Sequence, residues 1–367
     1  MKAGPTRKIL LGKTPEELKS IALSEGLPAY TGQQIAQWIY RKKVFSIDEM
    51  TDISKAGRER LSLSYEVGRT PFSDCQQSVD GTKKYLFPVL CTKKKGLNMV
   101  DEAQDLEASS IEAVMIPEGD RRTLCVSSQA GCRMGCRFCM TGHQGFHGNL
   151  SAGDIINQFL SVEESDSLSG SVFMGMGEPL DNYDNVLRAI EILTSDWGFG
   201  WSPKRITLST IGPLPELKKY LEETSCHLAV SLHSAFSEQR EELMPVQKAY
   251  PLKDIIELIR RYDFSGQRRV SFEYTMFAGL NDSKAYADAL IRLLRGVECR
   301  VNLIRFHKIP YFPYEAPSEV VMEMFRDRLS SSGLISTIRA SKGEDIFAAC
   351  GMLAGTHKND KSLKANE

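Results

Sequence analysis

Three cysteines lie close together in the segment Cys132-x-x-x-Cys136-x-x-Cys139. Three thiolates on one short loop can hold three corners of a 4Fe–4S cluster and leave the fourth iron open to a small molecule. A structural zinc site would need a fourth ligand, for which His143 and His147 are the nearest candidates. Three unrelated buried thiols are the other alternative. The spacing favours the iron–sulfur cluster.

The rest of the composition narrows the class of protein. The chain has 367 residues with nine cysteines, 46 Lys plus Arg and 47 Asp plus Glu. An odd number of cysteines without an export signal argues against a disulfide framework. The balanced charge argues against a polybasic nucleic-acid binder but leaves room for a local basic surface. No apolar run approaches the roughly 18 residues that span a bilayer, so we expect no membrane span and a cytoplasmic location.

The elements that must position these cysteines follow from the apolar pattern. The first 65 residues are predicted to be helical, and a strand pair over 82–90 and 110–117 encloses a long polar loop at 91–110. From residue 123 strand-like and amphipathic helical segments alternate, which predicts a parallel sheet, and the last eleven residues are predicted to be disordered. The expected strands are 123–129, 171–177, 205–211, 227–234, 268–277, 299–306 and 334–341. The expected helices between them are 152–165, 184–196, 214–224, 251–264, 283–297 and 318–333.

Polar residues follow the ends of several of these strands, and the cysteine segment follows the first. A βα barrel collects its active site from several strand ends, whereas a doubly wound sheet concentrates it at one switch point. The pattern therefore favours an α/β fold of the barrel type.

Longer motifs extend this interpretation to a family. TLCVSSQAGCRMGCRFCMTGHQGF, FMGMGEPLDN, KRITLSTIG, AVSLHS, LMP and GEDIFAACGMLAG together resemble the RlmN and Cfr family of radical S-adenosylmethionine (SAM) RNA methyltransferases, over the chain to about residue 355. The resemblance implies a partial (βα)6 barrel of the TIM type with a small helical N-terminal accessory domain. The expected domains are 1–80, helical and in contact with RNA; 81–120, connecting strands; 121–345, the barrel; and 346–367, the Cys350 loop and tail.

The resemblance also implies a reaction and its residues. C2 of adenine is electron-poor and cannot attack SAM, so the family first methylates its own cysteine, a role that falls on Cys350. A second SAM, bound to the cluster of Cys132, Cys136 and Cys139, yields a 5′-deoxyadenosyl radical that activates this methyl group. Cys125 then resolves the protein–RNA adduct by forming a disulfide with Cys350. From the residues alone, both cysteines would be buried and inert.

Glu112 occupies the position of the family's proton acceptor. It lies in the apolar strand SSIEAVMIP, where burial would disfavour the charged carboxylate and strengthen it as a base. The alternative is an acid on an edge strand that faces water. Phe138, beside the cluster, is expected either against the adenine of SAM or in loop packing.

The SAM contacts follow from the positions of the matching motifs. Gly177 and Glu178 in GMGEP are expected to hold the amino group of SAM. The further expected contacts are Ser209, Ser231, Leu232, His233 and His307. His307 departs from the family pattern, which has Asn at this position, although both side chains can form hydrogen bonds.

The implied substrates are an adenine in the peptidyl transferase centre of 23S rRNA and the adenine 3′ of the anticodon in some tRNAs, with a flavodoxin-like electron donor. Arg41-Lys42-Lys43 is the preferred candidate for RNA contact among several basic clusters, although each cluster taken alone has the pattern of an ordinary solvated surface. Three alternatives remain: Cfr-type methylation at C8, a non-catalytic metal-stabilised RNA-binding protein, and a radical SAM enzyme for a small metabolite.

Overall fold

A computed structural model describes residues 7–92, 106–264, 266 and 268–354. Its contacts divide the chain into two compact units, each described here by itself. The helical unit comprises Met1–Phe72, Leu150–Ser167 and Asp184–Ser202. The sheet unit comprises Ser73–Asn149, Leu168–Tyr183 and Pro203–Glu367. Two helices that follow early strands of the sheet therefore group with the N-terminal residues, a division that the linear boundaries expected from the sequence do not describe.

The helical unit is built from short helices whose starts are encoded locally. Thr14 and Glu17 form a capping box at the first helix, and the side chains of Ser54 and Ser151 cap two others. The helical elements are α1 (Pro15–Ser24), α2 (Thr31–Ala36), the π-helical turn η1 (Gln37–Arg41), η2 (Ile47–Glu49), α3 (Lys55–Ser64), α5 (Ala152–Ser161) and α6 (Tyr183–Thr194). Strands β1 (Lys8–Ile9) and β2 (Tyr65–Glu66) pair in parallel.

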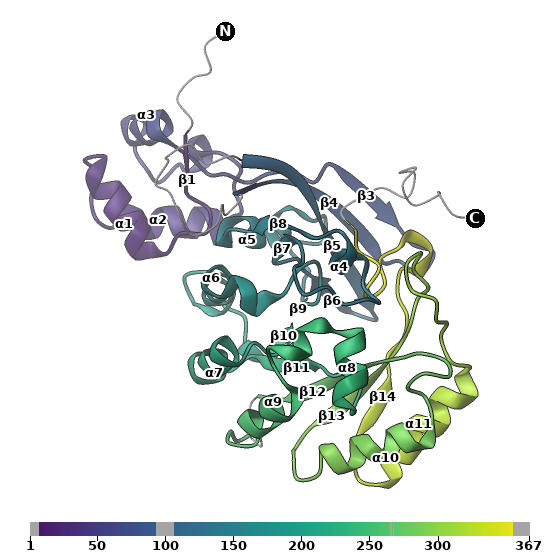
Figure 1. Cartoon of the computed structure of the whole chain (residues 1–367). Coiled ribbons are helices and arrows are strands. Elements are labelled where there is room, and N and C mark those ends of the chain that lie inside the picture. Colours follow the sequence, from purple (N-terminus) through teal and green to yellow (C-terminus); the bar gives the residue numbers. More distant parts are fainter. Residues whose placement is uncertain (1–6, 93–105, 265, 267, 355–367) are drawn as a thin grey trace, which may run out of the picture. The chain divides into compact units, whose positions relative to one another are not determined.

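The sheet unit contains a ten-stranded sheet in the order β14-β13-β12-β11-β10-β9-β6-β5-β4-β3 (Figure 1). The antiparallel part consists of β3 (Asp74–Gln77), β4 (Lys83–Thr92), β5 (Leu106–Glu118) and its partner β6 (Arg121–Cys125). From β6 onward all pairs are parallel, through β9 (Gly170–Phe173), β10 (Ile206–Thr210), β11 (His227–Ser231), β12 (Val270–Met276), β13 (Arg300–Arg305) and β14 (Ser336–Ile338).

Helices follow most of the parallel strands, as expected for βα units. They are α7 (Leu214–Glu223), α8 (Ser237–Leu243), α9 (Leu252–Ile259), α10 (Lys284–Leu293) and α11 (Glu319–Ser331). Short elements complete the unit: β7 (Gln129–Gly131), α4 (Met140–His143), β8 (Phe146–Asn149), and the 3-10 turns η3 (Pro179–Asn182), η4 (Pro203–Arg205), η5 (Pro245–Lys248) and η6 (Glu344–Ile346).

The two faces of the parallel sheet differ in chemistry. Tyr274 of β12 stacks on Phe325 of α11 with ring centroids 5.4 Å apart, which identifies the face that the helices cover. Side chains alternate along a strand, so Glu273 belongs to the opposite face. Ser231, Glu273, Asn302 and Thr337 stand side by side in register on β11 to β14 and form a polar row on this inner face.

The predicted α/β fold with a parallel sheet and a partial barrel is confirmed. The parallel strands are shorter than the pattern suggested. The expected strand 123–129 ends at Cys125, and the chain enters β7 at Gln129. The expected loop at 91–110 is shorter at both ends, because β4 and β5 extend into it. The centre of this loop and the predicted disordered tail lie outside the described residues. In the described part of the chain, no helix is long and apolar enough to cross a membrane.

Candidate active site

The three clustered cysteines lie on the loop between β7 and α4, which backbone hydrogen bonds fix at several points. The amide of Cys132 donates to the carbonyl of Gly145 at 2.8 Å, and that of Cys139 donates to the carbonyl of Cys136 at 3.2 Å. Each thiol is half-buried. The loop therefore holds three sulfur donors in a defined conformation.

The loop packs against an apolar cluster that limits access of water. Cys136 and Phe138 lie against a core that includes Met244, Phe277 and Phe312. The Phe138 ring also meets His233 edge-on, with centroids 4.8 Å apart. Phe138 thus packs within the loop's own surroundings, in line with the second of its two expected roles.

The donor set suits an iron–sulfur cluster. Burial, together with the nearby Cys139, Glu178 and Asp181, raises the pKa of Cys132 to about 12. Burial and the other two thiols raise the pKa of Cys136 well above its ordinary value. Three thiolates that repel one another in an apolar setting are stabilised by a cationic iron centre, and binding it releases their protons.

No group of three potential ligands in the described part of the chain is already arranged as a metal site. His143, a candidate fourth ligand for zinc, has its Nε2 atom 2.8 Å from the carbonyl oxygen of Arg137. The three thiols are therefore the donors that this loop offers to a cluster.

Arg240 of α8 is a fully buried cation that the sequence did not reveal. Its guanidinium donates to the carbonyl oxygens of Leu232 at 3.2 Å, Ser231 at 3.0 Å and Ile211 at 3.3 Å, and to Oε1 of Gln247 at 2.5 Å. Burial lowers its pKa to about 10, against the opposing effect of Cys136. Arg240 ties the end of β11 to the segment after β10 and places a positive charge near the cluster loop.

The segment around Cys350 is attached to the helix that follows the cluster loop. The amide of Met140 donates to the carbonyl of Gly351 at 2.8 Å, and the hydroxyl of Thr141 donates to the carbonyl of Leu353 at 2.7 Å. Gly351 has φ +86°, a conformation that glycine adopts without strain. Cys350 has exposed surface, yet desolvation by the surrounding protein raises its pKa.

Cys125 and Cys350 are brought close together, and both are free thiols. Cys125 ends β6, is 7% exposed and pairs in register with Val114 of β5. Burial, followed by the charge of Cys350, raises the pKa of Cys125 to about 12. Two cysteines far apart in the sequence therefore lie close enough to interact electrostatically.

Glu112 lies on β5, two residues before Val114, which pairs with Cys125, and so shares a face of the strand with Val114. It is 1% exposed, which contradicts the alternative of an edge acid facing water. Its Oε1 forms an ion pair with Lys84 Nζ at 3.0 Å, and its Oε2 accepts from the amide of Ala354 at 2.8 Å. The carboxylate is thus neutralised by a buried lysine and anchored to the Cys350 segment.

Glu178 lies beneath the ends of β9 and β10. Its Oε1 accepts from Thr210 Oγ1 at 2.6 Å and from the amide of Leu180 at 3.1 Å, and its Oε2 accepts from the amide of Ile211 at 3.0 Å. Burial raises its pKa to about 7 despite these hydrogen bonds. Gly177 has φ +100°, and a Cβ there would lie 2.5 Å from the Gln129 side chain. The motif therefore requires glycine before a buried, fixed carboxylate.

The remaining expected SAM contacts surround the ends of β10, β11 and β13. Ser209 and Ser231 are half-buried, and Leu232 is fully buried. His233 has φ +56°, and its Nδ1 accepts from the amide of Thr275 at 3.0 Å, while burial lowers its pKa to about 3. A neutral imidazole here holds the backbone at the end of β11.

His307 is buried, and its Nδ1 atom lies 3.2 Å from Oε1 of Glu344 in η6. The side chain of His307 therefore contacts the segment that leads to Cys350. This contact does not test the expected contact with SAM.

The sequence analysis did not identify Glu273 as a site residue, although a lone carboxylate in the apolar strand 268–277 could have indicated it. It is 3% exposed, and its Oε1 accepts from Asn302 Nδ2 at 2.8 Å and Ser271 Oγ at 2.9 Å. Its Oε2 has no hydrogen-bond partner among the described residues. Burial raises its pKa, while the charge of Arg339 opposes the rise. The polar row on the inner face thus offers one free acceptor.

Comparison with known proteins places this arrangement in a family. Residues 9–67 match the model of the ribosomal RNA large subunit methyltransferase N-terminal domain, and residues 126–290 match that of the radical SAM superfamily. A protein of Porphyromonas gingivalis called probable dual-specificity RNA methyltransferase RlmN is 56% identical, over 98% of this chain and 100% of its own length. The dual-specificity RNA methyltransferase RlmN of Syntrophus aciditrophicus is 41% identical, over 94% of this chain and 96% of its own length.

A solved structure agrees with these matches. The crystal structure of a radical SAM methyltransferase from Sphaerobacter thermophilus has a TM-score of 0.85 and 36% sequence identity, over 95% of this chain and 99% of that one. The similarity thus extends over nearly the whole of both chains. The chain belongs to the RlmN family of radical SAM methyltransferases.

Proposed function

We propose that this enzyme methylates C2 of adenine in RNA, at the peptidyl transferase centre of 23S rRNA and 3′ of the anticodon in some tRNAs. The observation that supports it best is the electrostatic interaction of Cys125 with Cys350, together with the hydrogen bond that joins Glu112 to the amide of Ala354, four residues after Cys350. A radical SAM enzyme for a small metabolite has no use for two extra thiols and a proton acceptor at this place. The names of the relatives fit the same substrate class.

Cys132, Cys136 and Cys139 would hold the 4Fe–4S cluster of the family. When bound, the cluster supplies the electron that cleaves SAM and a site for the amino acid part of SAM. Glu178 would accept a hydrogen bond from the SAM ammonium with its remaining lone pairs. Ser209, Ser231, Leu232, His233 and His307 would line the rest of the SAM site. A flavodoxin-like protein would deliver electrons in the cytoplasm.

Cys350 would act first as a nucleophile. Its thiol loses a proton, its sulfur takes the methyl group of one SAM, and S-adenosylhomocysteine leaves. With the cluster bound, cleavage of a second SAM would supply the radical chemistry that takes one hydrogen atom from the S-methyl group of Cys350, with 5′-deoxyadenosine as the by-product. The resulting methylene radical adds to C2 of adenine, and one electron then leaves the adduct. Two SAM molecules are thus consumed in each turnover.

Release of the RNA would need a base and a second thiol. Glu112 takes the proton from C2 of the adduct, and the Lys84 ammonium at 3.0 Å stabilises the carboxylate before the transfer. The Cys125 sulfur attacks the Cys350 sulfur, so the bond between sulfur and the methylene carbon breaks and a disulfide forms. The methylene carbon is protonated to a methyl group. An external dithiol reduces the disulfide for the next turnover.

The pKa of Glu178 predicts how SAM binding depends on pH. Only the charged carboxylate attracts the SAM ammonium, and burial has raised the pKa to about 7. Affinity should therefore be full above this pKa and fall about tenfold for each pH unit below it. Equilibrium dialysis of SAM with the reconstituted enzyme between about pH 5.5 and pH 8 measures this.

Glu178→Gln is the matched variant, because it keeps the size of the side chain and removes its titration. The variant should bind SAM more weakly at high pH and with a flat profile across neutrality. A wild-type profile that is equally flat would contradict the role of Glu178.

Analysis of the methylated nucleoside tests the proposed function. The enzyme, SAM, a reducing system and unmodified 23S rRNA or tRNA should together yield 2-methyladenosine in nucleoside chromatography. A product that co-elutes with 8-methyladenosine would assign the Cfr-type reaction instead. Absence of any methylated nucleoside, with SAM cleavage intact, would contradict RNA methylation.

A further inference from the structure

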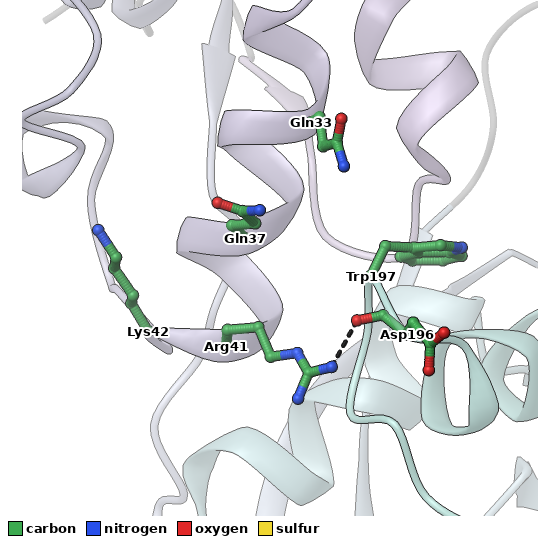
Figure 2. Close-up of a pocket in the computed structure, with 6 residues that line it drawn as sticks. All are labelled: Gln33, Gln37, Arg41, Lys42, Asp196 and Trp197. Carbon is green, nitrogen blue, oxygen red and sulfur yellow. Dashed lines mark hydrogen bonds between the residues drawn. The ribbon is translucent and has the colours of Figure 1, made fainter.

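A pocket of about 520 Å³ in the helical unit lies outside the machinery described above. Its volume is within the range of about 300–1,000 Å³ that small-molecule sites occupy. One wall comes from α2 and η1, and the other from the turn after α6, as Figure 2 shows. It is lined by Gln33, Gln37, Arg41, Lys42, Asp196 and Trp197.

The helical wall presents polar groups at regular intervals. Gln33, Gln37 and Arg41 are spaced by four residues, so successive turns place them on one side of the helix. Figure 2 shows all three on the side that faces Asp196 and Trp197. The wide π-helical turn occupies Gln37–Arg41, and such turns occur frequently at functional sites. Neither Gln33 nor Gln37 uses its side-chain amide in a hydrogen bond with any described residue, so both remain available to a ligand.

The opposite wall is an aromatic surface of fixed position. Arg41 donates to the carbonyl oxygens of Asp196 and Phe199, which fixes the turn. The Trp197 ring packs against Tyr40 with centroids 5.6 Å apart and keeps part of its surface exposed. A supported indole beside unsatisfied amides suits a planar, hydrogen-bonding group better than an aliphatic one.

The charge of the pocket indicates an anionic ligand. Arg41 and Lys42 contribute two positive charges, and Asp196 contributes one negative charge. Lys42 Nζ lies over the Trp38 ring, 3.3 Å from its centroid, and forms no ion pair with a described carboxylate. A nucleotide combines a planar base, whose amino group would donate a hydrogen bond to Asp196, with a phosphate that Lys42 and Arg41 would attract.

We propose that this pocket binds one unstacked nucleotide of a single-stranded part of the RNA substrate, with its base on Trp197 and its phosphate near Lys42. The inference rests on the proposed function and adds a second contact that is separate from the methylated adenine. Proteins read RNA in this way, through bases that leave their stack and lie on aromatic side chains.

The test compares the KM for 23S rRNA of the full-length reconstituted enzyme with that of Trp197→Ala, and Lys253→Ala is the control variant. Stacking of one base contributes about 1–3 kcal/mol, so Trp197→Ala should raise the KM for 23S rRNA by about tenfold. Trp197→Phe, which retains an aromatic face, should restore most of this loss. Lys253 is an exposed lysine of the sheet unit, and its replacement should change KM by less than twofold.

Gln37→Ala keeps the inference testable if loss of Trp197 disturbs its packing on Tyr40. The Gln37 side chain is exposed, so this variant should fold normally and still raise the KM for RNA about threefold. If Trp197→Ala and Gln37→Ala both behave like Lys253→Ala, the pocket does not bind RNA. Tighter binding of free 5′-AMP than of a single-stranded oligoribonucleotide would assign the pocket to a free nucleotide and overturn the inference.

S-methylation of Cys350 by SAM in the absence of RNA separates this inference from the proposed function. It should proceed equally in the wild type, Trp197→Ala and Gln37→Ala, because the pocket takes no part in it. A wild-type enzyme that fails to methylate Cys350 would contradict the proposed function. Normal Cys350 methylation with unchanged KM in the pocket variants would overturn the pocket alone.

Discussion

Replacement of Cys125 by alanine is expected to stop turnover at a covalent complex between protein and RNA. Cys350 would still be methylated and its methylene group would still add to adenine, since neither step uses Cys125. Resolution requires a thiol that can reach the Cys350 sulfur, and Cys125 is close enough for the charge of Cys350 to raise its pKa. Free methylated RNA should fall by more than about a hundredfold, a barrier increase of about 3 kcal/mol.

The adduct is measured by denaturing gel electrophoresis and by the mass of the Cys350 peptide after nuclease digestion. Cys226→Ala is the matched control, because Cys226 is also buried in the sheet unit but lies beside Tyr220 and Arg268 instead of Cys350. The control should turn over without trapping RNA. An inactive Cys125→Ala enzyme without an adduct, or one that turns over like the control, would contradict the resolving role.

Replacement of Arg240 by methionine should lower the free energy of unfolding more than any other substitution proposed above. The buried guanidinium satisfies three carbonyl oxygens and Gln247, and each acceptor left without a partner costs about 1–3 kcal/mol. Removal of a buried charge offsets part of this cost. We expect a net loss of about 3 kcal/mol in the free energy of unfolding, which lowers Tm by roughly 5–10 °C.

Differential scanning calorimetry of the cluster-free protein gives the Tm, with Arg295→Met as the control. Arg295 is exposed in the same unit, and a substitution of this kind changes stability by about 0.5 kcal/mol or less. Equal Tm values for the two variants would show that Arg240 does not hold the strand ends together.

The sequence was most informative where chemistry depends on local spacing. Three cysteines within one short loop indicate a cluster whatever the rest of the fold, and alternation of apolar patterns indicates a parallel sheet. Strand lengths were less accurate: the expected strand 123–129 ends at Cys125, although residues 126–129 are also buried. Periodicity records burial, whereas a strand also needs a hydrogen-bonded neighbour.

Residues that act through distant partners could not be predicted in the same way. Arg240 stands in the charged segment SEQREEL, which has the composition of a solvated helix, and its burial depends on how the ends of β10 and β11 and the turn η5 converge. Lys84 resembles any strand lysine until the register of β4 and β5 places it beside Glu112. Trp197 and Gln37 form one pocket only because a turn more than 150 residues away folds back on η1.

The central claim is that Cys350 carries the methyl group, and the mass of its peptide tests this most directly. The protein is reconstituted anaerobically with iron and sulfide and given SAM with a heavy methyl group, in the absence of RNA. We predict that the Cys350 peptide gains one labelled methyl group while the Cys125 peptide gains none. A cluster that forms and cleaves SAM while Cys350 stays unmodified would contradict the account.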